Sequence, residues 1–226
     1  MTTMSKAIPL AKPSALGSGE AGSFAAPLGT VQDGRFTFTR GTSQTTITAG
    51  YDPKQLFEAQ FSGVVPVVKT QADQVTVRYP HLPLLGWLIY HFRRPRAQIA
   101  LNATIPWSLQ FDGGVSHLSA DLAGISLQAI ALHGGISQAS FLLPQPEGTV
   151  SIRLADGASG VWLKRPLGTA VRIQMTGSFD RLTIDGQHFG AAGNGLQWET
   201  ESYAQASHRY SIEIVGGASH ITVGTW

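Results

Sequence analysis

Histidines and carboxylates are the side chains of this sequence that could bind a metal ion or perform acid–base catalysis. His117 and His220 occupy the same position of two repeated segments, but other segments hold Gln, Gly or Arg there. No His-x-x-x-His spacing, which would place two imidazoles on one helix face, occurs in the chain. The sequence therefore predicts no metal site.

Aspartates could form the carboxylate pair of a polysaccharide-cleaving enzyme, which needs two such groups close together. The candidates are scattered, and their equivalents in other repeats are not acidic: Asp112, Asp121, Asp156, Asp180 and Asp185. Aspartates in turns commonly bond the local backbone. We expect no catalytic residue and no cofactor, and keep a carbohydrate-active or carbohydrate-binding protein as the alternative.

Glycine pairs and serines also fail to form a nucleotide-binding or nucleophile motif. No Gly-Gly pair is followed by Gly-Lys-Ser/Thr, the sequence that closes a phosphate-binding loop. Ser159, in Gly157-Ala158-Ser159-Gly160, misses the Gly-x-Ser-x-Gly spacing of a nucleophile elbow. These residues are better explained as parts of turns.

Composition limits the function further. Among 226 residues, Lys and Arg number 16 and Asp and Glu 14, so the formal net charge of +2 does not favour nucleic-acid binding. The absence of cysteine excludes a disulfide framework. Only 13% of residues are charged and 26 are Gly, as is typical of a protein of strands and turns.

A repeated sequence motif defines the strands and turns that position these side chains. An alternating apolar segment leads to a glycine-rich corner, and a second alternating segment follows it. The corners are Arg40-Gly41, Gly113-Gly114, Gly134-Gly135, Asp156-Gly157, Gly177-Ser178 and Gly216-Gly217. The four corners from 114 to 178 are 21, 22 and 21 residues apart. This period predicts an all-β, solenoid-like stack of short strands, in which successive units lie side by side.

Other segments fit the same all-β plan. We expect strands at 56–61, 64–68 and 75–79, and a looser insertion at 185–208 that could supply a degenerate unit. Residues 1–28 are rich in Ala, Gly, Ser and Pro and are predicted to be a disordered tail, followed by a single domain over 29–226. We recognise no signal peptide and no apolar run long enough to span a bilayer, and expect a cytoplasmic or envelope-associated protein.

The corner phrase Gly-Gly-Ala/Val/Ile-Ser-x-apolar resembles the toast-rack family, also called the putative-adhesin domain. It is carried by the corners from Gly113 onward, by Leu142-Leu143-Pro144 and by the segment 211–223. The family forms the C-terminal domain of Lia-type and phage-shock-type bacterial envelope-stress proteins. The resemblance implies a toast-rack fold and a non-enzymatic structural or interaction module in cell-envelope assembly or stress response.

Residues 82–92 are the one segment that the repeat does not explain. The candidate interaction patch consists of Leu84, Leu85, Trp87, Leu88, Ile89, Tyr90, Phe92, Arg93, Arg94 and Arg96. The segment either caps the open core of the stack or docks a partner, and we expect it to cover the core. The expected partner is another protein, with peripheral membrane contact and homo-oligomerisation, including a self-assembling scaffold, left open.

Overall fold

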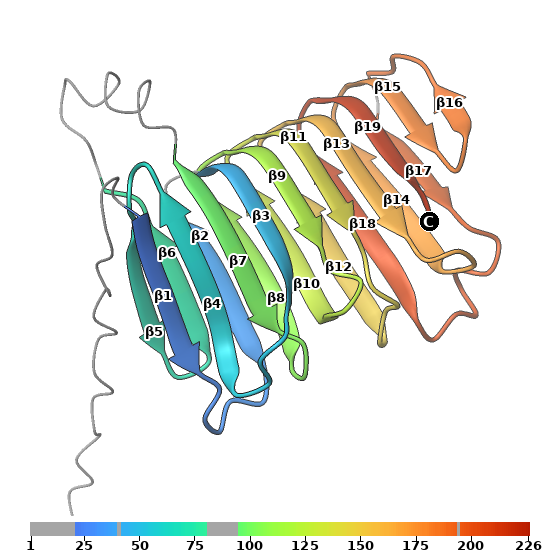
Figure 1. The fold of residues 1–226 in the computed structure, drawn as a ribbon. Coiled ribbons are helices and arrows are strands. Elements are labelled where there is room, and N and C mark those ends of the chain that lie inside the picture. Colours follow the sequence, from blue (N-terminus) through green and yellow to red (C-terminus); the bar gives the residue numbers. More distant parts are fainter. Residues whose placement is uncertain (1–20, 40–41, 81–94, 194) are drawn as a thin grey trace, which may run out of the picture.

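The computed structural model describes residues 21–39, 42–80, 95–193 and 195–226. This described part forms nineteen strands in two sheets and contains no helix, which confirms the all-β prediction. The two sheets pack face to face, with one hydrophobic core between them (Figure 1). None of its segments is a helix that could cross a membrane.

Ten strands form the first sheet, and nine form the second. In spatial order the ten-stranded sheet consists of β1 (Ala21–Pro27), β4 (Gln55–Ser62), β7 (Arg96–Asn102), β3 (Thr42–Gly50), β9 (Val115–Asp121), β11 (Ile136–Leu142), β13 (Ala158–Arg165), β19 (Ala218–Thr225), β15 (Phe179–Ile184) and β16 (Gln187–Phe189). The nine-stranded sheet consists of β17 (Leu196–Glu199), β14 (Ala170–Thr176), β18 (Arg209–Val215), β12 (Thr149–Leu154), β10 (Ser126–His133), β8 (Pro106–Asp112), β2 (Gly34–Thr39), β6 (Gln74–Arg78) and β5 (Val67–Gln71).

Each repeated unit places its first strand in the nine-stranded sheet and its second in the ten-stranded sheet. In the unit β10–β11, Leu132 ends the first strand inside the core, the glycine corner turns the chain, and Ala139 and Phe141 re-enter the core. Strands of neighbouring units pair in parallel, with equivalent residues side by side. The alternation read from the sequence is therefore the inward and outward alternation of the strands.

The corners require glycine for two reasons. Gly134 and Gly177 have backbone φ angles of +93° and +115°, which residues with a Cβ rarely adopt. Corners of neighbouring units also touch through their backbones. A Cβ on Gly177 would lie 2.6 Å from the carbonyl oxygen of Gly216, and one on Gly134 would lie 2.9 Å from the nitrogen of Gly114. Both features confirm the structural role expected for these glycines.

The spatial order of the units differs from their order in the sequence. The last unit, β18–β19, lies between β12–β13 and β14–β15 and pairs in parallel with both. At the other end, β6 and β7 lie outside the unit β2–β3. Among the corner units, the expectation that successive units lie side by side is therefore correct from β2–β3 through β12–β13, and it is wrong for β14–β15, which pairs with β18–β19 and not with β12–β13. The sequence period shows which segments are equivalent, but sequence equivalence alone does not determine which of them pair.

Antiparallel strands flank both ends of the stack. β1 pairs with β4 and β5 with β6 at one end, while β16 pairs with β15 and β17 with β14 at the other. Residues 187–189 and 196–199 are thus antiparallel edge strands and not a degenerate unit. β1 also corrects the expected tail, because Ala26 is buried and Phe24 contacts Phe61 edge to face at 5.7 Å. The described fold therefore includes β1 and does not begin at residue 29.

The interaction patch expected around residues 82–92 lies outside the described residues, except for Arg96. Arg96 is the first residue of β7, and its Nε donates to Oε1 of Gln44 (2.7 Å). Residues 79–95 connect β6 to β7, the position at which the other units have a glycine corner.

Candidate functional site

A bulge recurs at one register across the ten-stranded sheet. One residue in each repeated strand has positive φ and is skipped by the pairing, so that Ser137 pairs with Ser159 and then Ala139 pairs with Val161. The bulge residues are Gln44, His117, Gln138, Gly160, Arg181 and His220, with φ between +52° and +62°. Because all six strands carry the extra residue at the same place, their ladders stay in register.

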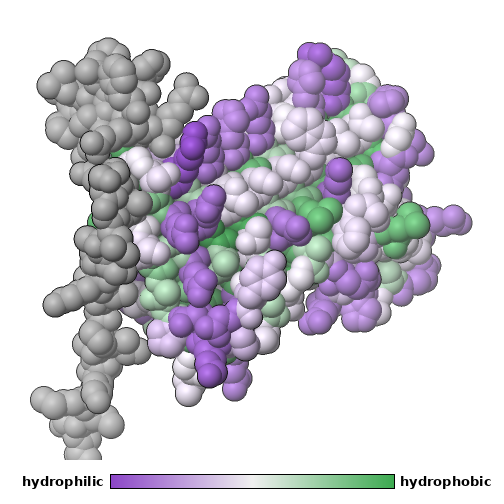
Figure 2. Space-filling model, in the orientation of Figure 1, coloured by the Kyte–Doolittle hydropathy of each residue, from purple (hydrophilic) through white to green (hydrophobic). Residues whose placement is uncertain are grey.

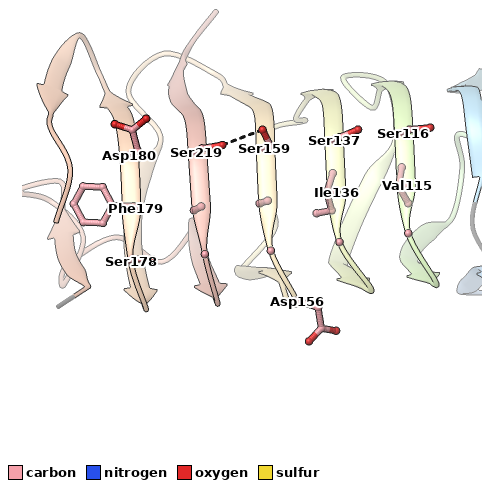
Figure 3. A pocket seen from close by; sticks show the side chains of 16 residues that line it. Val115, Ser116, Ile136, Ser137, Asp156, Ser159, Ser178, Phe179, Asp180 and Ser219 are labelled. Carbon is pink, nitrogen blue, oxygen red and sulfur yellow. Dashed lines mark hydrogen bonds between the residues drawn. The ribbon is translucent and has the colours of Figure 1, made fainter. Parts of the chain in front are cut away.

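The residue before each bulge points outward, and together these residues form a row. Each member pairs with the next one on the neighbouring strand, in the spatial order Ser43, Ser116, Ser137, Ser159, Ser219 and Asp180. Five hydroxyl groups are thus held about 4.8 Å apart, the spacing of adjacent strands. Figure 3 shows the part of the row from Ser116 to Asp180. It borders a shallow groove of about 850 Å³ between the row and the glycine corners, which we call the serine groove.

The side chains of the serine groove mostly bond within the protein itself. The Ser219 hydroxyl donates to the Ser159 hydroxyl (3.0 Å), and Asp156 accepts from the backbone nitrogen of Gly134 (3.1 Å). Asp180 accepts from Nε of Arg181 (2.9 Å). Hydroxyl groups both donate and accept hydrogen bonds, so the row suits an extended polar ligand lying across the strands.

The five aspartates considered as catalytic candidates are not brought together. Besides the two in the groove, Asp112 accepts from Gln110 (3.1 Å), and Asp121 accepts from the backbone nitrogen of Ala123 (3.2 Å). Asp185 forms an ion pair described below. Over the residues that the structure describes, no group of three or more His, Cys, Asp or Glu could hold a metal ion. Asp121 and Asp156 accept from backbone nitrogens, as expected for turn residues, whereas Asp112 and Asp180 lie within strands and bond side chains.

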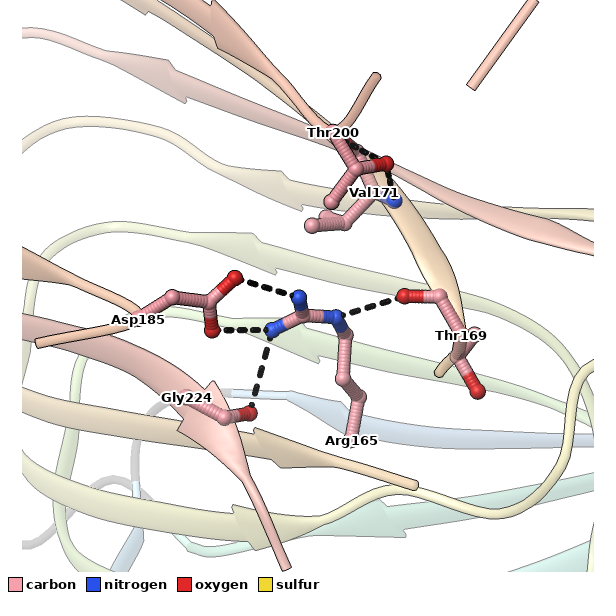
Figure 4. Close-up of polar contacts among 6 residues, drawn as sticks. All are labelled: Arg165, Thr169, Val171, Asp185, Thr200 and Gly224. Atoms are coloured by element: carbon pink, nitrogen blue, oxygen red, sulfur yellow. Dashed lines mark hydrogen bonds and ion pairs between the residues drawn. The ribbon is translucent and has the colours of Figure 1, made fainter. Parts of the chain in front are cut away.

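Arg165 connects the last three units near the end of β13. This guanidinium is only 4% exposed and makes two bonds to the carboxylate of Asp185, at 2.8 and 2.6 Å (Figure 4). It also donates to the carbonyl oxygens of Thr169 (2.9 Å) and Gly224 (3.3 Å). Arg165 therefore ties β13 to the hairpin after β15, across the intervening strand β19.

Tyr210 supplies a second polar anchor in the core. Its hydroxyl donates to the carbonyl oxygen of Pro144 (2.7 Å), so β18 is fixed to the connection between β11 and β12. Burial raises the pKa of the Tyr210 phenol, because the phenolate would lose its hydration. The side chain is thus held neutral and acts as a donor.

Trp162 is a surface residue that sequence reasoning missed. Its side chain points outward from β13 and is 45% exposed, three residues beyond the serine row. Small hydroxyl side chains hold the equivalent position in the other strands: Thr46, Ser119, Ser140, Thr222 and Thr183. Aligning the repeats would have revealed Trp162 as the single large side chain in an otherwise small, polar row.

Trp226 lies on the same face, beyond the end of β19. Its backbone nitrogen donates to the carbonyl oxygen of Arg165 (3.0 Å), so the pairing with β13 continues past Thr225. Its indole nitrogen donates to the carbonyl oxygen of Leu143 (3.2 Å), while 53% of the residue remains exposed. The neighbouring Leu167 is 82% exposed. Figure 2 shows a mainly hydrophilic and neutral surface in the view of Figure 1, with small, separate hydrophobic areas.

The fold and its outer surface thus define an all-β, two-sheet protein whose units turn at glycine corners. Solved structures include a similar protein: a "putative cell adhesion protein" of Clostridium sporogenes aligns over 92% of this chain and 100% of its own, with a TM-score of 0.67 and 15% identity. A "putative adhesin" of Bacteroides fragilis aligns over 92% and 98%, but its TM-score of 0.31 at 8% identity carries no argument. No family model and no curated protein sequence matches the chain. At this level of identity, the first likeness shows the fold alone.

Proposed function

We propose that this chain is a non-enzymatic, adhesin-like interaction module that uses the outer face of its ten-stranded sheet. The observation that carries the proposal is the serine row, in which Ser116, Ser137, Ser159 and Ser219 repeat one chemical group across neighbouring strands. A surface that repeats at fixed spacing suits a partner that is itself extended and repetitive.

The rigidity of this surface favours binding. Ser137 and Ser159 are fixed by parallel ladders on both sides, and the core residues on either side of them are buried. A pre-organised site loses little conformational entropy when it binds, so more of the contact energy appears as affinity. Each bulge places one further residue outward beside the row, on the side away from the glycine corners.

An envelope-associated role extends this proposal. The Clostridium sporogenes protein with the same fold is described as a cell adhesion protein, and the glycine-corner phrase resembles the toast-rack family. Both support placing the chain among proteins that contact components of the bacterial cell envelope. Its expected partner is then a surface polymer or protein of the envelope, contacted through the outer face.

The test compares two matched pairs of substitutions. Ser137→Lys with Ser159→Lys fills the serine groove, while Ser151→Lys with Ser211→Lys changes two paired, outward serines of the nine-stranded sheet. Binding of each protein to immobilised bacterial envelope fragments is measured by biolayer interferometry, with a thermal melt to confirm folding. We expect wild type and the Ser151/Ser211 variant to bind and the groove variant to lose binding. Equal binding by both variants, or no binding by wild type, contradicts the proposal.

A further inference from the structure

We propose that Trp162 and Trp226 form a binding site for an uncharged polysaccharide chain that runs along β13 and β19. We call this surface the tryptophan track; it consists of Trp162, Thr222, Gly224 and Trp226. The inference rests on the proposed function, because it names a ligand class for the same face of the ten-stranded sheet. The track meets the serine groove where Ser159 and Ser219 begin their strands.

The geometry of the track follows from strand alternation. Trp162 pairs with Thr222, and Thr222 and Gly224 are alternate residues of β19. Trp226 follows β19 and continues its backbone bonding to β13, so the same alternation places it on the side of Thr222 and Gly224. Trp226 is four residues beyond Thr222, which places the two tryptophan positions roughly 13 Å apart along the strand direction. Gly224 has no side chain, and no heavy atom would approach within 4 Å of a Cβ placed there. Gly224 therefore leaves room for a ligand between the indoles, beside the outward side chain of Lys164 on β13.

The indole of Trp226 is held in place, and both tryptophans are about half exposed. Trp226 is anchored by the bond from its indole nitrogen to the carbonyl oxygen of Leu143 (3.2 Å). Trp162 is 45% exposed and Trp226 53% exposed, so each ring presents about half of its surface to solvent while the remainder packs on the protein. Fixed aromatic side chains supply large contact areas at a low entropic cost.

The chemistry around Trp162 favours a sugar. The face of an indole carries negative charge density, and the C–H groups of a pyranose face are weakly positive, so the two stack. The equatorial hydroxyls of the same sugar then point sideways. Beside Trp162 they would meet the hydroxyl side chains of Ser140 and Thr222, its direct neighbours in the sheet. An aromatic ring bordered by hydroxyls matches this pattern of an apolar face with a polar rim.

Other partners fit less well. A stable protein interface has a continuous apolar centre, whereas the row through Trp162 consists of serine and threonine. An anionic membrane attracts clusters of basic residues, and Lys164 is the cation that β13 presents on this face. An uncharged glycan needs neither feature. Two separated indoles can bind different rings of one chain, so longer oligosaccharides should bind more tightly.

Uncharged polysaccharides of known linkage provide the test: β-1,4-glucan oligosaccharides, galactomannan and soluble α-glucan, with anionic alginate for comparison. Binding is followed by titration calorimetry and by quenching of tryptophan fluorescence. We expect at least one uncharged glycan to bind, and Trp162→Ala and Trp226→Ala each to weaken it by about tenfold or more. Tyr51→Ala, which removes a fully exposed aromatic from the turn after β3, is the matched control and should bind like wild type.

Several results would overturn the inference: no binding of any uncharged glycan, binding of alginate alone, or unchanged affinity in Trp162→Ala. The envelope assay separates this failure from failure of the proposed function. If Trp162→Ala binds envelope fragments like wild type and the Ser137/Ser159 variant does not, the polysaccharide site is wrong and the interaction module stands. If both variants bind like wild type, both proposals are wrong.

Discussion

The ion pair between Arg165 and Asp185 allows a sharp test of how the last units are held together. Asp185→Ala removes two charge-assisted bonds and leaves a guanidinium that is 4% exposed. Breaking a fully buried ion pair costs about 3–5 kcal/mol. The side chain of Asp185 is 28% exposed, so water can partly replace it, and Arg165 keeps its bonds to Thr169 and Gly224. We therefore expect a loss of about 2–3 kcal/mol in unfolding free energy.

Changing the other partner of the ion pair, Arg165, should cost less unfolding free energy than Asp185→Ala. Arg165→Met removes the buried charge and fills similar space, and the carboxylate of Asp185 can turn toward solvent. The double variant Arg165→Met with Asp185→Ala should be more stable than Asp185→Ala alone, since no buried charge is left unpaired. Urea unfolding followed by tryptophan fluorescence gives the four free energies of this double-mutant cycle. Additive effects, or a larger loss for Arg165→Met than for Asp185→Ala, would refute the reasoning.

Three further predictions concern the corners, the core tyrosine and the segment that the repeat does not explain. Gly177→Ala should destabilise by at least about 2 kcal/mol, because it combines a positive φ with a backbone clash, whereas Gly186→Ala, with positive φ and no neighbour within 4 Å, should cost about 1 kcal/mol in the same urea assay. The raised pKa of Tyr210 means that the unfolded chain ionises first as the pH rises past about 10, so stability is full below that pH and falls above it. Tyr210→Phe removes the hydrogen bond to Pro144 and should lose about 1–3 kcal/mol of unfolding free energy at neutral pH. Because it also removes the titrating phenol, its stability should decline less steeply at alkaline pH; a decline identical to that of wild type would contradict the assignment of Tyr210 as a buried, neutral donor. If the segment 82–92 covers the core, Trp87→Ala should lower stability by about 3–5 kcal/mol while Arg94→Ala changes little, and an unaltered melt for Trp87→Ala would instead favour docking.

Sequence periodicity predicted the strands of this fold well. The inward positions and the glycine corners follow directly from alternation and turn chemistry, whereas the strand expected at 64–68 lies at Val67–Gln71 (β5). The spatial order of the units did not follow, because the interfaces between equivalent units are chemically alike. Ser159, for example, pairs with Ser219 and not with Asp180. A comparison of alternative neighbours, and not the period itself, would be needed to predict that order.

The candidate site was predictable only in part. The serines after the corners were visible in the sequence, where the turn backbone was their expected partner; the bulges instead turn them outward along the groove. Successive side chains of a strand alternate between the core and solvent, and the extra residue of each bulge reverses this alternation for the residues that follow. Beyond the bulge, however, Val161 and Leu163 alternate inward, so an alignment of the repeats would have placed Trp162 on the surface.

The insertion of β18–β19 between two earlier units has a consequence for biosynthesis. β14 and β15 are made before residues 209–225, yet the parallel partners of both strands lie in that last segment. Until the ribosome has released it, β13 and β14 each have an unpaired edge, and the unit β14–β15 has no neighbour on which to dock. The contacts that complete the stack join residues 60 apart, such as Ser159 and Ser219. Long loops of this kind close slowly. Folding of this end should therefore be a late step that waits for residues 209–225, during which the exposed edges are open to chaperones and to pairing with other copies.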